Sequence, residues 1–312
     1  LYIVFSHVFC HYFFSNNKSS LHQQFSVTKS FTSALIGIAI DEGYLNLNDT
    51  VLDFFSNREI DNWDDRKLNI TIEHLLSMNS GFEWNEAIND ALWFNSDDQI
   101  QYILDRPIAD NPGSKFNYNS GNAHLLSAIL QNVTGVSTLD FALEKIFIPI
   151  GITSYTWDSD PQGIYYGGHG LSITTREMAK FGFLYLNNGS WEGEQIVPSE
   201  WVKLSTSYQI NIDSNNDYGY LWWIFPSLET YYASGFLSQL IFNFHQYDLL
   251  VVFTARIINY YILVDFLKHY ILPSLEEYPN YTPSITSTSS LQPIIILVSI
   301  LVLLSNKKKI KR

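Results

Sequence analysis

Cysteine and positive charge are both scarce in this 312-residue chain. Cys10 is the only cysteine, which excludes an internal disulfide and matches no metal-site spacing. The chain has 18 lysines and arginines against 31 aspartates and glutamates, so its formal net charge is -13. An acidic chain without a basic face does not suit phosphates, so nucleic acid is excluded as an expected partner. His7, His11 and His22 are scattered without metal-ligand spacing, and no cofactor is expected.

Two sequence signals of common protein classes are also missing. Residue 1 is Leu1 rather than Met, and residues 1–14 show no charged start followed by an apolar core. We therefore expect that the natural N-terminus, with any signal peptide, is absent from this sequence. No Gly-x-Ser-x-Gly motif occurs, which argues against the nucleophile elbow of the α/β-hydrolases.

The C-terminal 40 residues differ in composition from the rest of the chain. Residues 273–290 are rich in Pro, Ser and Thr and predict a linker. Residues 291–306 are almost wholly apolar and lead directly into the basic tail, residues 307–312. This run is shorter than the roughly 20 residues of a usual spanning helix. Its place between a linker and five cations nevertheless favours a membrane-anchor segment over a core helix.

This arrangement predicts a folded domain over residues 1–272 that is membrane-anchored and extracytoplasmic, with the basic tail in the cytoplasm. The predicted membrane contact is made through the C-terminal segment, as a transmembrane helix. A cleaved sorting signal would have the same sequence pattern, so that alternative stays open.

The order of the expected elements predicts an α+β fold. Apolar, β-branched runs predict an N-terminal strand hairpin, residues 1–5 and 8–14. Four strand-like runs predict an antiparallel meander near the other end: residues 218–225, 230–234, 238–245 and 249–255. Helices are expected between and after them, at residues 51–55, 71–77, 122–133 and 260–271 and after the capping pairs Ser137/Asp140 and Thr174/Glu177. We expect one antiparallel sheet from the N- and C-terminal segments, with helices packed on it and an inserted helical region.

The stretch from Phe25 to Gly43 predicts a buried helix that begins at Ser26, because its apolar residues recur at intervals of three and four. Ser26 and Lys29 then share one face, with the ammonium beside the hydroxyl at the helix start. An ordinary lysine is protonated at neutral pH, so a lysine acting as base needs burial and hydrogen-bonding neighbours. A second Ser-x-x-Lys match begins at Ser15, but its Asn-rich surroundings favour a solvated loop.

Four blocks of the sequence together resemble the serine β-lactamase-related family. In chain order they are FSVTKSFTSALIGIAIDEGYL, FNYNSGNAHLLSAIL, GGHGLSITTREMAKFGFLYLNNGSW and YYASGFLSQLIF. The family includes class C β-lactamases, D-Ala-D-Ala carboxypeptidases and esterase-like serine hydrolases. The resemblance covers residues 1–272 and implies the β-lactamase/transpeptidase-like fold. It also implies that Ser26 is the acylated nucleophile and Lys29 its basic partner.

The later blocks imply the rest of the catalytic site. By resemblance to the Tyr-x-Asn block, Tyr118 is the partner in proton transfer and Ser120 takes the Asn-like position. The third block, on a strand, matches Ser234 and Gly235, and the backbone of Phe236 would complete an oxyanion hole. Removing one such donor typically costs about 100- to 1,000-fold in rate.

Several other residues match parts of these patterns and receive structural interpretations. Tyr44 and Tyr185 also begin a Tyr-x-Asn pattern, but neither has the loop before a helix that Tyr118 has. His169, in a glycine-rich loop, is expected to buttress the site, and His124 is expected to be a packed helix residue.

The sequence departs from the family pattern at two places. Ala233 replaces the basic residue that meets a substrate carboxylate, and Phe236-Leu237 stand where glycines are usual. The first departure favours an ester or amide over a β-lactam. We therefore predict a serine hydrolase that forms an acyl-enzyme on a small-molecule or peptide-like ester or amide. The alternative is a catalytically inactive binding module at the cell surface that kept the fold.

Overall fold

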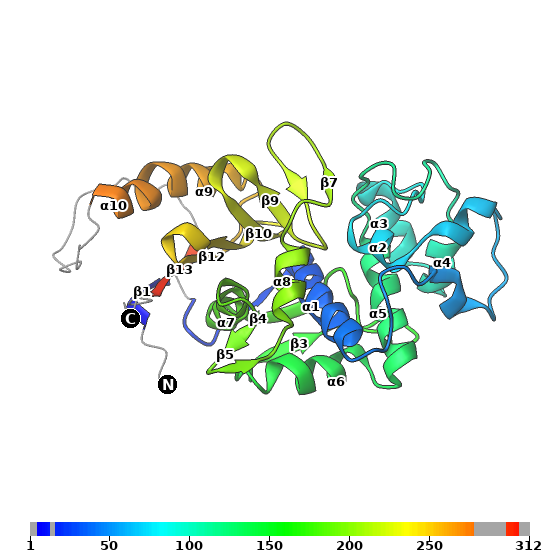
Figure 1. Ribbon diagram of the computed structural model, residues 1–312, viewed down its shortest axis with the longest axis horizontal. Helices are drawn as coiled ribbons and strands as arrows, with labels where there is room; N and C mark the ends of the chain where they lie inside the picture. The colour runs from blue at the N-terminus through cyan, green and yellow to red at the C-terminus, as the bar shows by residue number, and fades with distance from the viewer. Residues whose placement is uncertain (1–4, 13–15, 278–297, 306–312) are drawn as a thin grey trace.

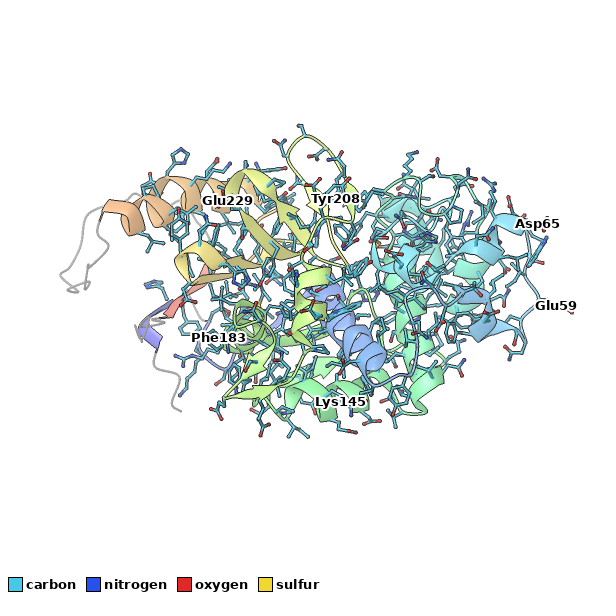
Figure 2. All side chains as sticks on the ribbon, viewed as in Figure 1. Glu59, Asp65, Lys145, Phe183, Tyr208 and Glu229 are labelled. Atoms are coloured by element: carbon cyan, nitrogen blue, oxygen red, sulfur yellow. The ribbon has the colours of Figure 1, made fainter. Side chains whose placement is uncertain are left out.

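A computed structural model describes residues 5–12, 16–277 and 298–305 of the chain (Figure 1). The molecule is elongated. A β-rich part, with α9 and α10 on its outer side, lies at one end, and a helical part built from α2 to α5 lies at the other (Figure 1). Helix α1 runs between the two. Figure 2 shows Glu59 and Asp65 at the outer end of the helical part.

The largest element is an eight-stranded sheet in the order β1-β13-β12-β11-β10-β9-β8-β7, in which all neighbouring strands are antiparallel. Its strands are β1 (Phe5–His11), β7 (Ile210–Asn211), β8 (Asp217–Tyr218), β9 (Trp223–Phe225), β10 (Thr230–Gly235), β11 (Gln239–Phe244), β12 (Leu249–Ala255) and β13 (Val298–Ser305). The predicted sheet from both ends of the chain is confirmed, and so is the antiparallel meander after Tyr218.

Two smaller sheets complete the β structure. One has the order β2-β4-β3 and the other pairs β5 with β6. Their strands are β2 (Leu21–Gln23), β3 (Tyr155–Trp157), β4 (Leu171–Thr174), β5 (Ser190–Trp191) and β6 (Glu194–Gln195). Strand β2 ends two residues before Phe25, so this small sheet fixes the approach of the chain to Ser26.

The helices connect and cover these sheets. They are α1 (Thr28–Asp41), α2 (Ile72–Leu76), α3 (Glu86–Phe94), α4 (Gln99–Leu104), α5 (Ser120–Thr134), α6 (Thr138–Ala142), α7 (Thr175–Leu186), α8 (Ser199–Ser205), α9 (Tyr261–Phe266) and α10 (Leu272–Glu277). Helix α7 packs against β11 and β12, whereas α1 packs against α5. Twelve of the fourteen residues of α1 are buried, so this helix lies inside the core rather than on it.

The capping signals in the sequence are confirmed where they set helix ends. Thr174 and Glu177 form a reciprocal capping box at the start of α7. The Ser137 side chain accepts a hydrogen bond from the Asp140 backbone amide at the start of α6. Gly43, after α1, has the left-handed φ of +79° that a C-terminal cap needs.

The predicted N-terminal hairpin is wrong. A single strand, β1, runs through the expected turn and pairs with β13 instead of with a neighbouring segment. The physical reason is that the partner of this apolar run lies almost 300 residues further along the chain. Local sequence carries no information about so distant a pairing.

The C-terminal part also differs from the prediction. Residues 273–277 of the expected linker belong to α10, and residues 298–305 of the expected anchor form β13 between β1 and β12. A short apolar run suits a central strand as well as a helix. Across the described ranges, no helix has both the length and the apolar character needed to cross a membrane. The described ranges do not include residues 278–297 and 306–312. These contain the rest of the expected linker and anchor and the whole basic tail. Membrane attachment therefore stays a prediction.

Candidate active site

Ser26 lies in a 3₁₀ turn, Phe25–Val27, immediately before α1. The α-helix thus begins two residues later than the sequence predicts, while Lys29 lies in its first turn. Lys29 Nζ is 2.9 Å from Ser26 Oγ. Phe25 has φ +48°, which is uncommon for an aromatic residue and marks a constrained turn next to Ser26.

Three oxygen atoms surround the Lys29 ammonium nitrogen. Besides Ser26 Oγ, they are Ser120 Oγ at 2.9 Å and the Gly168 carbonyl oxygen at 3.0 Å. Lys29 itself is only 1% exposed. The helix, the start of α5 and the glycine-rich loop therefore converge on one buried amino group.

Tyr118 lies beside the Lys29 amino group, in the loop that leads into α5. Asn119 caps α5 by accepting a hydrogen bond from the Asn122 amide, which leaves Tyr118 just before the helix and Ser120 as its first residue. Lys29 Nζ lies 4.8 Å from the centroid of the Tyr118 ring. Burial raises the pKa of the Tyr118 hydroxyl, opposed by the Lys29 charge and by hydrogen bonds with Ser26 and Lys29. The phenol is therefore protonated at neutral pH.

Strand β10 brings the third block to the nucleophile. A Cβ atom on Gly235 would lie 2.2 Å from the Gln24 carbonyl oxygen, so only glycine permits this approach. Phe236 follows the strand with 61% of its surface exposed, and its ring meets that of Phe25 edge-on at 5.6 Å. These contacts place the end of β10 directly beside the turn that carries Ser26.

The turn after Phe236 adopts the backbone shape that glycines usually supply. Leu237 and Ser238 have φ values of +58° and +66°. The Ser238 hydroxyl donates a 2.6 Å hydrogen bond to the Ile257 carbonyl, and the Ser238 amide donates to the Gly235 carbonyl. Bulkier residues are thus held by local hydrogen bonds in a conformation that otherwise favours glycine.

The predicted site residues are gathered around one cavity of about 540 Å³. Six of them line it: Ser26, Tyr118, Ser120, Ser234, Gly235 and Phe236. Lys29 lies beneath this surface, in contact with Ser26 and Ser120. Three segments that are far apart in the sequence therefore meet at one pocket.

The cavity wall also contains residues that the sequence did not single out. Glu86 and Asp90, one turn apart on α3, are the only acidic or basic side chains apart from His169 among the lining residues. Burial and the nearby Glu86 carboxylate raise the pKa of Asp90 to about 7, opposed by Lys29. Phe94, Trp223 and Tyr260 add aromatic surface. Glu86, Asp90 and Phe94 are spaced at i, i+4 and i+8 along α3, so the sequence indicated that they share one helix face. It did not indicate that this face lines the pocket.

The Glu86 carboxylate accepts hydrogen bonds from three donors at the edge of the site. Its Oε2 accepts hydrogen bonds from Trp84 Nε1 at 2.7 Å and from the Ser120 amide at 3.0 Å. Its Oε1 accepts a hydrogen bond from the Ser120 hydroxyl. Glu86 is thereby connected to Lys29 through a single hydroxyl group.

The glycine-rich loop supports the site through its backbone. The Gly167 carbonyl accepts a 2.7 Å hydrogen bond from the Thr32 hydroxyl, and the Gly168 carbonyl accepts one from Lys29. His169 lines the cavity, and burial together with nearby Lys29 and His124 lowers its pKa to about 3. Its imidazole is therefore uncharged at neutral pH.

His124 lies fully inside the structure, with Nε2 3.0 Å from a carboxylate oxygen of Asp160. Burial lowers the pKa of His124, although the Asp160 carboxylate opposes this shift. Within the residues that the structure describes, no cluster of three or more His, Cys, Asp or Glu side chains could hold a metal ion.

Comparisons with known proteins place this geometry in a family. A beta-lactamase family model matches residues 8–256. An uncharacterized protein of Alkalihalophilus pseudofirmus is 27% identical over 244 residues, 67% of this chain and 64% of that protein. The chain belongs to the serine beta-lactamase-related family.

Solved structures have the same fold. A Bacillus anthracis protein assigned as a 6-aminohexanoate-dimer hydrolase matches with a TM-score of 0.66 and 26% identity, over 74% of this chain and 66% of that one. A family VIII carboxylesterase matches with a TM-score of 0.59 and 16% identity, over 73% of this chain and 75% of that one. The chain spans slightly less than two thirds of the Alkalihalophilus and Bacillus anthracis proteins.

Proposed function

We propose that this protein is a serine hydrolase that cleaves an ester or amide through an acyl-enzyme on Ser26. The observation that carries the proposal is the 2.9 Å contact between Lys29 Nζ and Ser26 Oγ, at the base of a cavity that Tyr118 also lines. A nucleophile within hydrogen-bond reach of a basic group that is itself held by other residues is the arrangement that covalent catalysis requires.

In the proposed acylation, the Ser26 oxygen attacks the substrate carbonyl carbon while its proton passes to Lys29 Nζ. Because burial raises the pKa of Tyr118, this side chain acts as a proton donor, and its hydroxyl gives a proton to the leaving group as the carbon–heteroatom bond breaks. Lys29 then returns a proton to Tyr118. Water, deprotonated along the same path, attacks the acyl-enzyme and releases the acid and Ser26.

Stabilisation of the tetrahedral intermediate is assigned to the backbone amides of Ser26 and Phe236. Both residues line the cavity, and the close approach of Gly235 to Gln24 holds the two segments together. Amide groups that are already positioned stabilise the developing oxyanion without reorganisation during the reaction.

The charge of the cavity supports an ester or amide substrate rather than a β-lactam carboxylate. Ala233 supplies no cation, and Glu86 and Asp90 would repel an anionic group. The solved structure that is 26% identical to this chain is assigned as a 6-aminohexanoate-dimer hydrolase. That assignment supports a hydrolase.

The proposal is tested with a fluorophosphonate probe and with p-nitrophenyl acetate. We expect the wild-type protein to be labelled and to turn over the ester, and Ser26→Ala to lose both activities. The matched control is Ser15→Ala, in the other Ser-x-x-Lys sequence, which should label as the wild type does. Equal labelling of the wild type and Ser26→Ala would refute the assignment, and a well-folded wild type without labelling or turnover would instead identify an inactive binding module.

A further inference from the structure

Glu86 has a hydrogen-bonding environment that fixes the role of each carboxylate oxygen. Oε2 receives the indole N–H of Trp84 and the backbone N–H of Ser120, and neither group can accept a hydrogen bond. Oε1 faces the Ser120 hydroxyl. A carboxylate has no hydrogen of its own, so the Ser120 O–H donates to Glu86.

This direction determines what Ser120 offers to Lys29. Once the hydroxyl hydrogen points at Glu86, Ser120 Oγ presents only lone pairs to Lys29 Nζ, 2.9 Å away. The Gly168 carbonyl, 3.0 Å from Nζ, can also only accept. The two N–H groups of a neutral lysine amine are then both used, and its lone pair is left for the hydroxyl groups of Ser26 and Tyr118, the other two neighbours of Lys29.

The structure assigns Glu86 as a positioning residue that, through Ser120, directs the lone pair of Lys29 onto the Ser26 hydroxyl. This inference rests on the proposed serine hydrolase function. The same arrangement serves the next state, since the ammonium formed by proton transfer has three N–H groups and three facing oxygens: Ser26 Oγ, Ser120 Oγ and the Gly168 carbonyl. Each proton-transfer state is fully hydrogen-bonded without any rotation of a side chain.

A glutamine of equal size would reverse the direction. Its Oε1 would have to meet the two N–H donors, Trp84 Nε1 and the Ser120 amide, so its NH₂ would face Ser120 Oγ. Ser120 would then accept from residue 86 and donate its own hydrogen to the Lys29 lone pair. That lone pair would no longer be available to Ser26.

The test compares kcat and KM for p-nitrophenyl acetate, and the rate of fluorophosphonate labelling, in wild type and Glu86→Gln. We expect kcat and the labelling rate to fall about 10- to 100-fold, less than the roughly 100- to 10,000-fold that a general base itself contributes because Lys29 is still present, with KM within about twofold. Glu83→Gln, an exposed carboxylate outside the cavity on the preceding segment, is the charge-matched control and should behave as wild type.

A double-mutant cycle separates this role from a general structural one. In a Ser120→Ala background, Glu86→Gln should have less than a twofold effect, because the hydroxyl that transmits its influence is gone. Glu86→Asp, which keeps a carboxylate, should recover part of the lost kcat.

Three results would overturn the inference: a kcat within twofold of wild type, a change in KM alone, or an equal loss in the Ser120→Ala background. If Glu86→Gln does not fold, Glu86→Met, which removes the acceptor but keeps the length, is measured in the same way. A wild type that neither labels nor turns over would refute the proposed function instead, so the two failures are distinguishable.

Discussion

The Tyr118 ring stacks on the indole of Trp223, with ring centroids 5.6 Å apart and an interplanar angle of 29°. Trp223 belongs to β9, so the central sheet supports the ring of a residue that lies in the loop before α5. Aromatic packing, in addition to the hydroxyl group, therefore sets the position of the phenol above Lys29.

Tyr118→Phe tests this division between packing and chemistry. The phenylalanine ring keeps the contact with Trp223 but lacks the hydroxyl that donates a proton to the leaving group. We expect kcat to fall about 100- to 1,000-fold, as for the loss of a general acid, with a melting temperature within about 2 °C of wild type. Ester turnover and circular dichroism measure the two effects. Full activity in the well-folded variant would contradict the assigned role of Tyr118.

Gly235→Ala should disable the site through the backbone. The new Cβ would lie 2.2 Å from the Gln24 carbonyl oxygen, so β10 and the segment before Ser26 must separate. We expect fluorophosphonate labelling to fall at least 100-fold and the free energy of unfolding to drop by about 1–3 kcal/mol, as for overpacking. Gly163→Ala is the control for the site, because no atom lies within 4 Å of its added Cβ: with φ +83° at Gly163 the new side chain should lower the stability through backbone strain, while labelling stays as in the wild type.

The part of the site that could be predicted from the sequence is the part encoded in short contiguous blocks. Ser26 and Lys29 lie three residues apart, and Tyr118 and Ser120 lie beside a helix start with an N-cap signal. Their meeting with β10 could be inferred only by family resemblance, because the contact between Gly235 and Gln24 joins residues more than 200 positions apart. Local periodicity contains no information about such a contact.

Two features could not be predicted from the sequence: the place of Glu86 in the site and the pairing of β1 with β13. Glu86 precedes Ser120 by 34 residues, on a helix whose outward and inward faces both carry apolar side chains, such as Ile88 and Trp93. Binary patterning therefore did not identify its pocket face. The apolar composition of the β13 segment suits a helix as well as a strand. It forms a strand because it lies between β1 and β12 and pairs with both.

His169 should make the folded state sensitive to acid. Its pKa is about 3 in the folded protein and about 6.5 when exposed, so between these values the unfolded chain binds a proton that the folded one does not. Stability contributed by the neutral side chain is present above about pH 6.5 and is lost as the pH falls toward 3. Urea titrations at pH 7.5 and pH 4.5 give the unfolding free energy that the protein loses on acidification. We expect this loss to be smaller in His169→Gln than in the wild type by more than about 1 kcal/mol. An unchanged loss would argue against this residue as the source.

Asp90 should give the cavity a charge that changes near neutral pH. Burial beside Glu86 raises the pKa of Asp90 to about 7, so its carboxyl group is largely neutral at pH 6 and ionised at pH 8. A substrate with a fixed positive charge is therefore bound better at pH 8, while an uncharged substrate of the same shape is not. For an interaction of roughly 1 kcal/mol, the gain is about fivefold.

The measurement compares kcat/KM for acetylcholine and its uncharged analogue, 3,3-dimethylbutyl acetate, at pH 6 and pH 8. We expect the ratio of the two values to rise about fivefold with pH in the wild type and to stay constant in Asp90→Asn. The ratio removes the pH dependence of the acyl-transfer step itself, which is common to the two esters. A rise of the same size in Asp90→Asn would assign the charge to a different group.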